Sequence, residues 1–558
     1  MVYNCLHNMS KKIIHGIEAQ TALLAGVNTI AQAVASTLGP RGRNVVFDRG
    51  YGTPIITNDG VSIVKEITLP DVFENIGASI IKEVAVKTND SAGDGTTTSI
   101  VLARAIATFG MNHITDGSNG LLLRKGIERA STEAIEILSG MAQRVKNKKE
   151  IEQVAALSAE SAELGKIIAA TIHTVGKDGV VTVEDSHEFG VTSEVVEGMA
   201  IDSGFVSHYM LTDKERMEAV FRNVAVLVTD RKISAIVDIV PMLEKLAALG
   251  KKELVVIAED IEGEALTTIV LNKMRGIFSV LAIKASGFGE RKFQELQDIA
   301  TLVGATVVTE SLVFALENAD TTVLGRAGKV VSTVNKTVIV EGKGKKSAIQ
   351  EHILGIKAHH AQIGTSKLDR FTKQHLEKRI AKLQSGIAVI RVGAATETES
   401  KYLKLKIEDA INATKAAIEE GIVPGGGVSF VKISEALSKK SKAILYSEKK
   451  EVRDGYQIVV DALTAPFRQI TQNAGFVDIE SLLQSVKDSE GALGYDASAD
   501  TETERVLVDM IKVGIIDPVK VTRTALQNAA SAAGILLTTD VAIADDEETV
   551  KRKLAEQE

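Results

Sequence analysis

The richest chemical pattern in the chain is the segment Gly93–Thr98, which reads GDGTTT and opens a predicted apolar helix. Its two glycines let backbone N–H groups converge, and the start of a helix carries partial positive charge. These properties predict a cradle for a phosphate group, and a plain helix N-cap is the alternative for the same residues. A Walker A loop is excluded because it requires a lysine that this segment lacks.

The aspartate inside this loop predicts a metal ion. Asp94 would repel a phosphate group unless a cation lay between the two charges, so we expect Asp94 to bind Mg²⁺. Three other glycine-centred segments, Thr37–Asn44, Thr57–Gly60 and Pro424–Gly427, could be turns or parts of the same site. Transfer of a phosphoryl group to water needs a second carboxylate that orients the water, and Asp409 could supply it or lie on a solvated helix face.

Helical patterns towards both ends of the chain must position these residues. Apolar residues recur every three or four positions in Thr21–Leu38, which predicts a helix that ends at Gly39-Pro40. The next segment, Asn44–Thr57, predicts a β-hairpin. Helices are expected from there to Ala142 and again after Arg391. The 45 glycines are expected mainly where the backbone meets phosphate or where domains pivot.

Residues 179–386 have a different pattern, in which short strands such as Val224–Val228 alternate with helices such as Ile233–Leu249. This pattern predicts an α/β domain with a partly parallel sheet, inserted into a helical domain that both chain ends build. Gly198 and Gly386 lie at the two seams and could act as hinges or be ordinary loop glycines.

Composition limits the class of protein. A chain of 558 residues is too long for one hydrophobic core, and its 45% hydrophobic content excludes a disordered protein. A net charge of −8 without a dense basic stripe argues against nucleic acid as a partner. The single cysteine, Cys5, indicates a reducing compartment, and the low-charge run Asn528–Thr539 is too short to span a membrane. We therefore expect a cytoplasmic protein.

Ten segments follow one another in an order and spacing that match a known family. They are TLGPRGRNVV, TNDGVSI, NDSAGDGTTT, EDIEGEAL, KASGFGERK, LQDIATL, VGAATETE, IEDA, GIVPGGG and IIDPVKVTRTALQNAAS. With them, the chain resembles the group I chaperonins (GroEL type) from about Met9 to Asp545. The resemblance implies a multidomain α+β and α/β fold with an equatorial ATPase domain (1–140 and 420–558), an intermediate hinge domain (141–197 and 388–419) and an inserted apical domain (198–387).

The resemblance also implies a function, namely protein folding driven by ATP binding and hydrolysis. The implied protein is a bacterial cytoplasmic homo-oligomer, a seven-membered single or double ring, and its ATPase falls in the isomerase class. It captures non-native proteins apically and encloses them under a GroES-type co-chaperonin, with ATP and Mg²⁺ as cofactors and K⁺ as a further candidate. A metabolic kinase lacks a recognisable acceptor pocket here, and the intact Asp59, Asp94 and Asp409 oppose a non-catalytic scaffold.

The resemblance assigns roles residue by residue. Catalysis is implied for Asp59 and Asp409, and the metal for Asp94. Nucleotide contacts are implied for Thr37, Leu38, Gly39, Pro40, Asp94, Gly95, Thr96, Thr97, Thr98, Gly426, Asp496, Ala497 and Asp517. Binding of substrate and lid is implied for Phe205, Tyr209, Met210, Val240, Leu243, Leu266, Val270 and Leu271. Without the resemblance, the helical spacing of several of these apolar residues would predict core positions.

The chain departs from the family pattern in four places. Asn58 replaces a lysine that is common near the phosphates, and Asp500–Arg505 adds about five residues beside the nucleotide. Phe476 and Val477 stand where many relatives have acidic residues between rings, so a single ring is the safer expectation. The usual Gly-Gly-Met tail is absent, which predicts a weaker contribution from the floor of the ring cavity.

Overall fold

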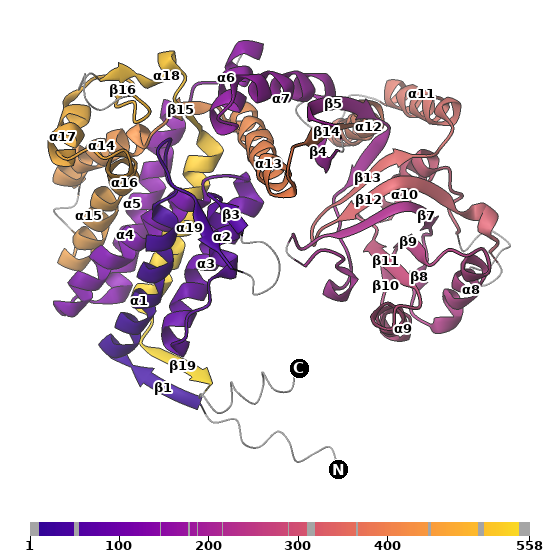
Figure 1. Cartoon of the computed structure of the whole chain (residues 1–558), viewed down its shortest axis with the longest axis horizontal. Coiled ribbons are helices and arrows are strands. Elements are labelled where there is room, and N and C mark those ends of the chain that lie inside the picture. Colours follow the sequence, from indigo (N-terminus) through magenta and orange to yellow (C-terminus); the bar gives the residue numbers. More distant parts are fainter. Residues whose placement is uncertain are drawn as a thin grey trace. The chain divides into compact units, whose positions relative to one another are not determined.

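A computed structural model describes residues 11–48, 55–145, 147–176, 179–186, 188–214, 216–287, 289–309, 319–363, 367–444, 448–499 and 507–545. Cys5 and the insertion Asp500–Arg505 lie outside the described residues. The chain forms two units (Figure 1). Each unit has its own hydrophobic core. The helical unit comprises Met1–Ala170, Asp185–Gly190 and Val392–Glu558, and the sheet unit comprises Thr171–Glu184 and Val191–Arg391.

The helical unit draws its elements from both ends of the chain, as the alternating patterns predict. Its N-terminal elements are β1 (Lys11–His15), α1 (Gly16–Ala35), β2 (Val45–Phe47), β3 (Ile55–Thr57), α2 (Gly60–Glu66), α3 (Val72–Ala92), α4 (Thr96–Thr115), α5 (Gly120–Met141), α6 (Lys148–Ser158) and most of α7 (Ala162–Val175). Its C-terminal elements are α13 (Glu397–Glu420), β15 (Ile422–Pro424), α14 (Val428–Ile444), α15 (Lys450–Ala462), α16 (Ala465–Asn473), α17 (Ile479–Asp488), β16 (Leu493–Gly494), β17 (Val508–Asp509), α18 (Met510–Val513), β18 (Ile516–Pro518), α19 (Val519–Thr538) and β19 (Val541–Asp545).

The long helices α1, α3, α4, α5, α15 and α19 pack around one apolar core. Some crossings are close enough to require glycine. A Cβ atom on Gly26 would lie 1.8 Å from the carbonyl oxygen of Glu74, and one on Gly77 would lie 1.9 Å from that of Leu23. These two glycines therefore let α1 and α3 touch through their backbones. The expectation that glycines serve mainly phosphate and pivots is thus incomplete, because helix crossings also use them.

Two predicted elements of the helical unit are confirmed. The predicted first helix is α1, which begins before Thr21, and β2 pairs antiparallel with β3 as the expected hairpin. Strands β1 and β19, from the two ends of the described chain, lie side by side in antiparallel register, with Ile13 opposite Ile543 (Figure 1).

The sheet unit is built on a six-stranded sheet of order β11-β9-β7-β12-β13-β6. Strands β7, β9 and β11 are parallel and the others pair antiparallel, so the predicted partly parallel sheet is confirmed. The elements of this unit are β4 (Val180–Asp185), β5 (Gly190–Val196), β6 (Gly198–Ile201), β7 (Ala219–Val228), β8 (Lys232–Ile233), α8 (Val240–Ala248), β9 (Glu253–Ala258), β10 (Asp260–Ile261), α9 (Gly263–Met274), β11 (Ser279–Lys284), α10 (Glu290–Val303), β12 (Gly325–Ser332), β13 (Thr337–Gly342), α11 (Lys346–Gln362), α12 (Lys367–Ser385) and β14 (Ile387–Gly393).

One helix of this unit is shorter than predicted. The expected helix Ile233–Leu249 begins only at Val240, and Ile233 belongs to the short strand β8. Pro241 explains the start, because proline lacks the N–H group that an interior helical position needs but fits the first turn.

The two seam glycines differ in their surroundings. Gly198 is the first residue of β6, so it is not a loop glycine, and a Cβ atom there would lie 2.5 Å from the carbonyl oxygen of Ile339. Gly386 lies between α12 and β14 with φ +62°, a conformation that favours glycine. Hinge motion at either residue stays a prediction, as does the division into three domains. Segments 141–170 and 392–419 belong to the helical unit.

Within the described ranges, no helix combines the length and the apolar character that crossing a membrane would require.

Candidate functional site

The N-terminus of α4 begins without a side-chain cap. Its N-cap is Gly95, at φ +81°, and no side chain accepts a hydrogen bond from the first turn. Ser99 is the residue whose N–H donates to the Gly95 carbonyl, at 3.0 Å. The N–H groups of Thr96, Thr97 and Thr98 precede this first helical bond, so they remain available to an anion. The plain N-cap alternative therefore lacks its capping side chain.

Two other predicted segments meet this helix start. The hydroxyl oxygens of Thr37 and Thr97 are 3.4 Å apart. A Cβ atom on Gly60 would lie 2.6 Å from the Thr97 hydroxyl oxygen, so the start of α2 lies directly against the start of α4. Asp59 is the N-cap of α2 and accepts from the N–H and the hydroxyl of Ser62. The packing thus places Asp59 next to the cradle.

Carboxylates accumulate around this cradle. Burial raises the pKa of Asp94. The hydrogen bond from the Gly95 N–H lowers this pKa in part, and repulsion from Asp59 raises it again. Burial raises the pKa of Asp409 well above its usual value, with added repulsion from Asp59 and Asp94. Burial, together with Asp94, raises the pKa of Asp517 to about 7. The raised pKa values indicate that the protein itself balances the negative charges of Asp94, Asp409 and Asp517 poorly.

A divalent cation fits this charge pattern. In the described part of the chain, no three His, Cys, Asp or Glu side chains are grouped as a ready metal cage. Mg²⁺ commonly binds through one or two carboxylates together with water and substrate phosphates, so a single ligand such as Asp94 is sufficient. The carboxylate cluster therefore suits Mg²⁺ that arrives with a phosphate group.

Asp517 connects the cradle to the predicted PGGG turn. Its strand β18 pairs antiparallel with β15, which places Asp517 opposite Val423. A Cβ atom on Gly425 would lie 3.0 Å from Asp517 Oδ1, so the turn packs on this carboxylate. Gly426 follows at φ +63°, close to Met510.

The remaining predicted nucleotide residues lie on two loops that hydrogen bonds hold together. Ala497 is buried in one small core with Met510, and Asp496 accepts from the N–H of Ser498 at 2.9 Å. Gly39 and Pro40 follow Leu38, whose carbonyl accepts from the Asn473 amide at 2.8 Å. Arg41 donates to the Ala499 carbonyl at 2.9 Å, which ties the first loop to the second.

Sequence reasoning missed Arg41 and Asn473 as supports of these loops. It also missed Lys406, whose charge lowers the pKa of both Asp94 and Asp409. The signal was available, because Lys406 stands three residues before Asp409 on the same helix.

The predicted substrate and lid surface is only partly exposed. Phe205, Met210 and Leu243 are buried in the core of the sheet unit, so for these three the core interpretation is correct in this structure. Tyr209 and Leu271 are 66% and 45% exposed. The other three predicted residues are half-buried: Val240, Leu266 and Val270. Neighbouring apolar side chains that the prediction omitted are exposed, namely Val237, Met274 and Ile277.

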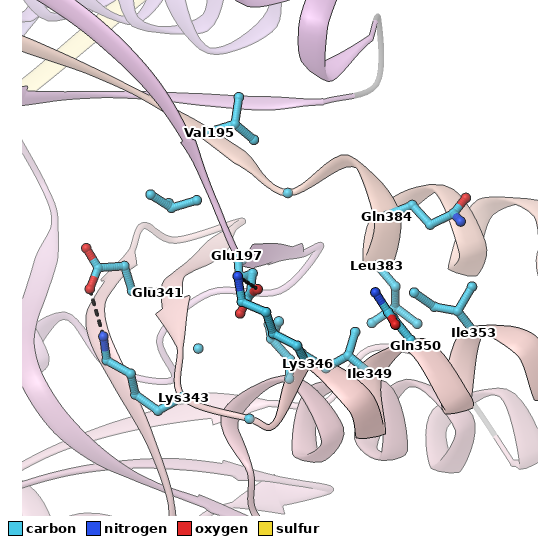
Figure 2. Close-up of a pocket in the computed structure, with 16 residues that line it drawn as sticks. Val195, Glu197, Glu341, Lys343, Lys346, Ile349, Gln350, Ile353, Leu383 and Gln384 are labelled. Atoms are coloured by element: carbon cyan, nitrogen blue, oxygen red, sulfur yellow. Dashed lines mark hydrogen bonds and ion pairs between the residues drawn. The ribbon is translucent and has the colours of Figure 1, made fainter.

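A groove of about 870 Å³ lies beside Gly198 and Gly386 in the sheet unit (Figure 2). Its charged side chains already form pairs. Lys346 is 3.0 Å from Glu197, and Lys343 is 2.9 Å from Glu341. This groove therefore lacks the unbalanced charge that marks the cradle at α4.

Comparison with known proteins identifies the family. A sequence profile of the TCP-1/cpn60 chaperonin family matches residues 30–547. Among solved structures, the chain is similar to the chaperonin gp146 from bacteriophage EL 2 (Pseudomonas aeruginosa), crystallised in the presence of ATP-BeFx. The two share 22% identity with a TM-score of 0.65, over 96% of this chain and 99% of that one, which confirms the expected multidomain chaperonin fold. The chain therefore belongs to the TCP-1/cpn60 chaperonin family.

Proposed function

We propose that this chaperonin is an ATP-dependent protein-folding machine of the group I type. The observation that carries the proposal is the uncapped start of α4 with the start of α2, and so Asp59, packed against it, together with the raised pKa values of Asp94 and Asp409. The solved chaperonin gp146 was crystallised with ATP-BeFx, which supports a nucleotide as the ligand of the corresponding fold.

Each residue then has a distinct task. The N–H groups of Thr96, Thr97 and Thr98 bind phosphate oxygens. Asp94 would hold Mg²⁺, and a bound Mg²⁺ would supply positive charge that offsets the charge of the phosphates. Asp409 orients the attacking water, and its raised pKa suits a group that accepts a proton as the water attacks. Asp59, whose carboxylate accepts a hydrogen bond from the Ser62 hydroxyl, is the second catalytic carboxylate of the proposal.

Nucleotide contacts beyond the phosphates belong to the same proposal. Gly426, Asp496, Ala497 and Asp517 would contact base and ribose, and Thr37, Leu38, Gly39 and Pro40 would line the phosphate side. K⁺ is a further candidate cofactor, and the isomerase classification of the ATPase stays a prediction.

The partners follow from the exposed apolar side chains of the sheet unit. A non-native protein exposes apolar groups of no fixed sequence, and each one buried gains roughly 1.5–3 kcal/mol before ordering costs. Tyr209 and Leu271, with Val237, Met274 and Ile277 nearby in sequence, offer such contacts. We infer that client proteins and a GroES-type lid use this surface in a homo-oligomeric ring, with seven subunits as the expected number.

The test measures phosphate release, refolding and client capture. Purified protein with MgATP should release phosphate to water. When a GroES-type lid is added, the protein should raise the fraction of a denatured client protein that refolds. Transfer of phosphate to a small-molecule acceptor instead would indicate a kinase. Leu271→Glu should abolish client capture and leave basal ATP hydrolysis intact, with the exposed Leu354→Glu as the matched control. Equal capture by both variants would refute the proposed surface.

A further inference from the structure

One side of α13 faces the phosphate cradle. Lys406, Asp409 and Asn412 recur every third residue, so they lie on one side of this helix. Asn412 shows how close that side comes, because a Cβ atom on Gly93 would lie 2.2 Å from the Asn412 Cβ atom. The side chain of Lys406 therefore belongs to the same helix surface that meets the loop with Asp94.

The position of Lys406 is fixed by specific contacts. Its Nζ atom is 2.6 Å from Glu160 Oε1, and it lies 5.6 Å from the centre of the Tyr402 ring. Only 11% of the Lys406 side chain is exposed. Glu160 has φ 50°, which is uncommon for a residue other than glycine. The backbone after α6 thus adopts an unfavourable conformation where it presents a carboxylate to this lysine.

The positive charge of Lys406 stabilises the ionised forms of Asp94 and Asp409. Burial and neighbouring carboxylates raise the pKa values of Asp94 and Asp409. The positive charge of Lys406 lowers both pKa values and so opposes these shifts. The Lys406 ammonium therefore contacts the carboxylate of Glu160, and its side chain shares one side of α13 with Asp409. An ammonium in this position reduces the negative charge that an anionic nucleotide must meet.

We propose that Lys406 is a positioning residue of the nucleotide site, whose ammonium group balances the carboxylates of Asp94 and Asp409 while Glu160 holds it in place. The inference rests on the proposed ATPase function and adds to it a charge-balancing pair, Lys406 and Glu160. Because the pair acts on the charge that the nucleotide meets, its effect falls on nucleotide affinity rather than on the chemical step.

The experiment compares Lys406→Met, Lys406→Arg and Glu160→Gln in the full-length protein with steady-state phosphate release from MgATP. Lys406→Met should raise KM for MgATP about tenfold with kcat changed less than about threefold. Lys406→Arg should restore KM to within about threefold of the parent. Glu160→Gln should raise KM by about threefold, because the ammonium is retained but less well held.

The control is Lys404→Met, which removes a lysine of the same helix that contacts Asp185 at 3.2 Å. This control should leave KM unchanged, and circular dichroism should confirm that each variant is folded. Unchanged KM in Lys406→Met, or a fall in kcat alone, would overturn the inference because it would show that the lysine only supports α13.

Failure of the proposed function gives a different result. If the parent protein releases no phosphate, the ATPase proposal fails, and equilibrium binding of MgATP then decides the inference. Weaker binding by Lys406→Met than by Lys404→Met supports the charge-balancing role, and equal binding refutes it.

Discussion

Both units withdraw aspartates from water, but the sheet unit pairs the negative charge with cations and the helical unit leaves it poorly balanced. In the sheet unit, Asp298 has a side chain only 4% exposed, and Arg379 donates to both of its oxygens at 2.8 Å. His352 adds a contact of 2.6 Å. In the helical unit, Asp94 and Asp409 are half-buried. Desolvation and mutual repulsion raise their pKa values, and Lys406 is the one cation named among the causes that lowers both.

If the proposed function holds, this difference separates a structural carboxylate, Asp298, from a functional one, Asp409. Breaking a well-paired buried charge costs stability, because the remaining partner is left without compensation. A group of poorly balanced carboxylates instead stores unfavourable charge that a cation or an anion-bound metal can relieve. Stability should therefore depend on Asp298, and activity should depend on Asp409.

The largest effect is expected for Asp409→Ala. Turnover should fall by about 10²–10⁴-fold, because the water loses the group that orients it, while ATP binding is retained. Phosphate release and equilibrium binding of ATP measure the two properties separately. Near-normal hydrolysis would remove Asp409 from the catalytic assignment.

Arg379→Met tests the opposite kind of site. It leaves the buried Asp298 without its main partner, so the sheet unit should lose about 3 kcal/mol of stability. Hydrogen exchange of the α10 amides in the full-length protein reports this loss. The control is Lys382→Met, whose more exposed pair with Asp202 should contribute at most about 1 kcal/mol. Equal losses in both variants would contradict the comparison.

Asp517→Asn tests whether unbalanced charge costs stability. The folded-state pKa of Asp517, about 7, lies above the ordinary value of 3.8, so the folded protein binds a proton that the unfolded protein releases between those values. Stability of the nucleotide-free protein should therefore fall as pH rises from about 4 to about 7. The variant should remove this slope and stabilise the protein at pH 8 by up to about 3 kcal/mol. An unchanged pH profile of thermal unfolding would argue against the burial of this charge.

The smallest effect is expected for Ser62→Ala. The Ser62 hydroxyl donates to Asp59, so its loss should reduce turnover by about two- to fivefold and stability by roughly 1 kcal/mol. Ser79→Ala is the control, because its hydroxyl donates only to a backbone carbonyl in its own helix. Equal turnover in the two variants would show that Ser62 does not fix Asp59.

Periodicity predicted the elements better than it predicted the site. Helix α1 is legible in the sequence because burial of one face repeats with the period of the helix. Strands β7 and β9 are legible as short, nearly continuous apolar runs that are buried on both faces. The proximity of Asp59, Asp94 and Asp409 has no local signal. The residues alone left Asp59 and Asp409 open as parts of one phosphate site or as a turn and a solvated helix face, and the family resemblance then assigned their roles. The three-residue spacing from Lys406 to Asp409 was the one local signal, and only packing shows that Lys406 contacts Glu160 whereas Lys404 contacts Asp185.

Exposure was equally hard to predict. Leu243 lies on α8 and Leu271 on α9, and each has an apolar neighbour three residues further along its helix, Leu246 and Met274. In the structure, Leu243 packs in the core and Leu271 remains 45% exposed. Which apolar face is left uncovered depends on the neighbouring elements, and a pattern within one helix does not report them.

The discontinuous helical unit has a consequence for biosynthesis. Helices α4 and α5 pack on α19, and β1 completes its pairing only with β19, so this core needs the last part of the chain. Ribosomes add about 5–20 residues per second, and roughly 380 residues separate the end of α5 from the start of α19. The nascent N-terminal helices therefore wait on the order of 20–80 s for their partner. Most of the sheet unit is continuous from Val191 to Arg391, so it can fold during that interval.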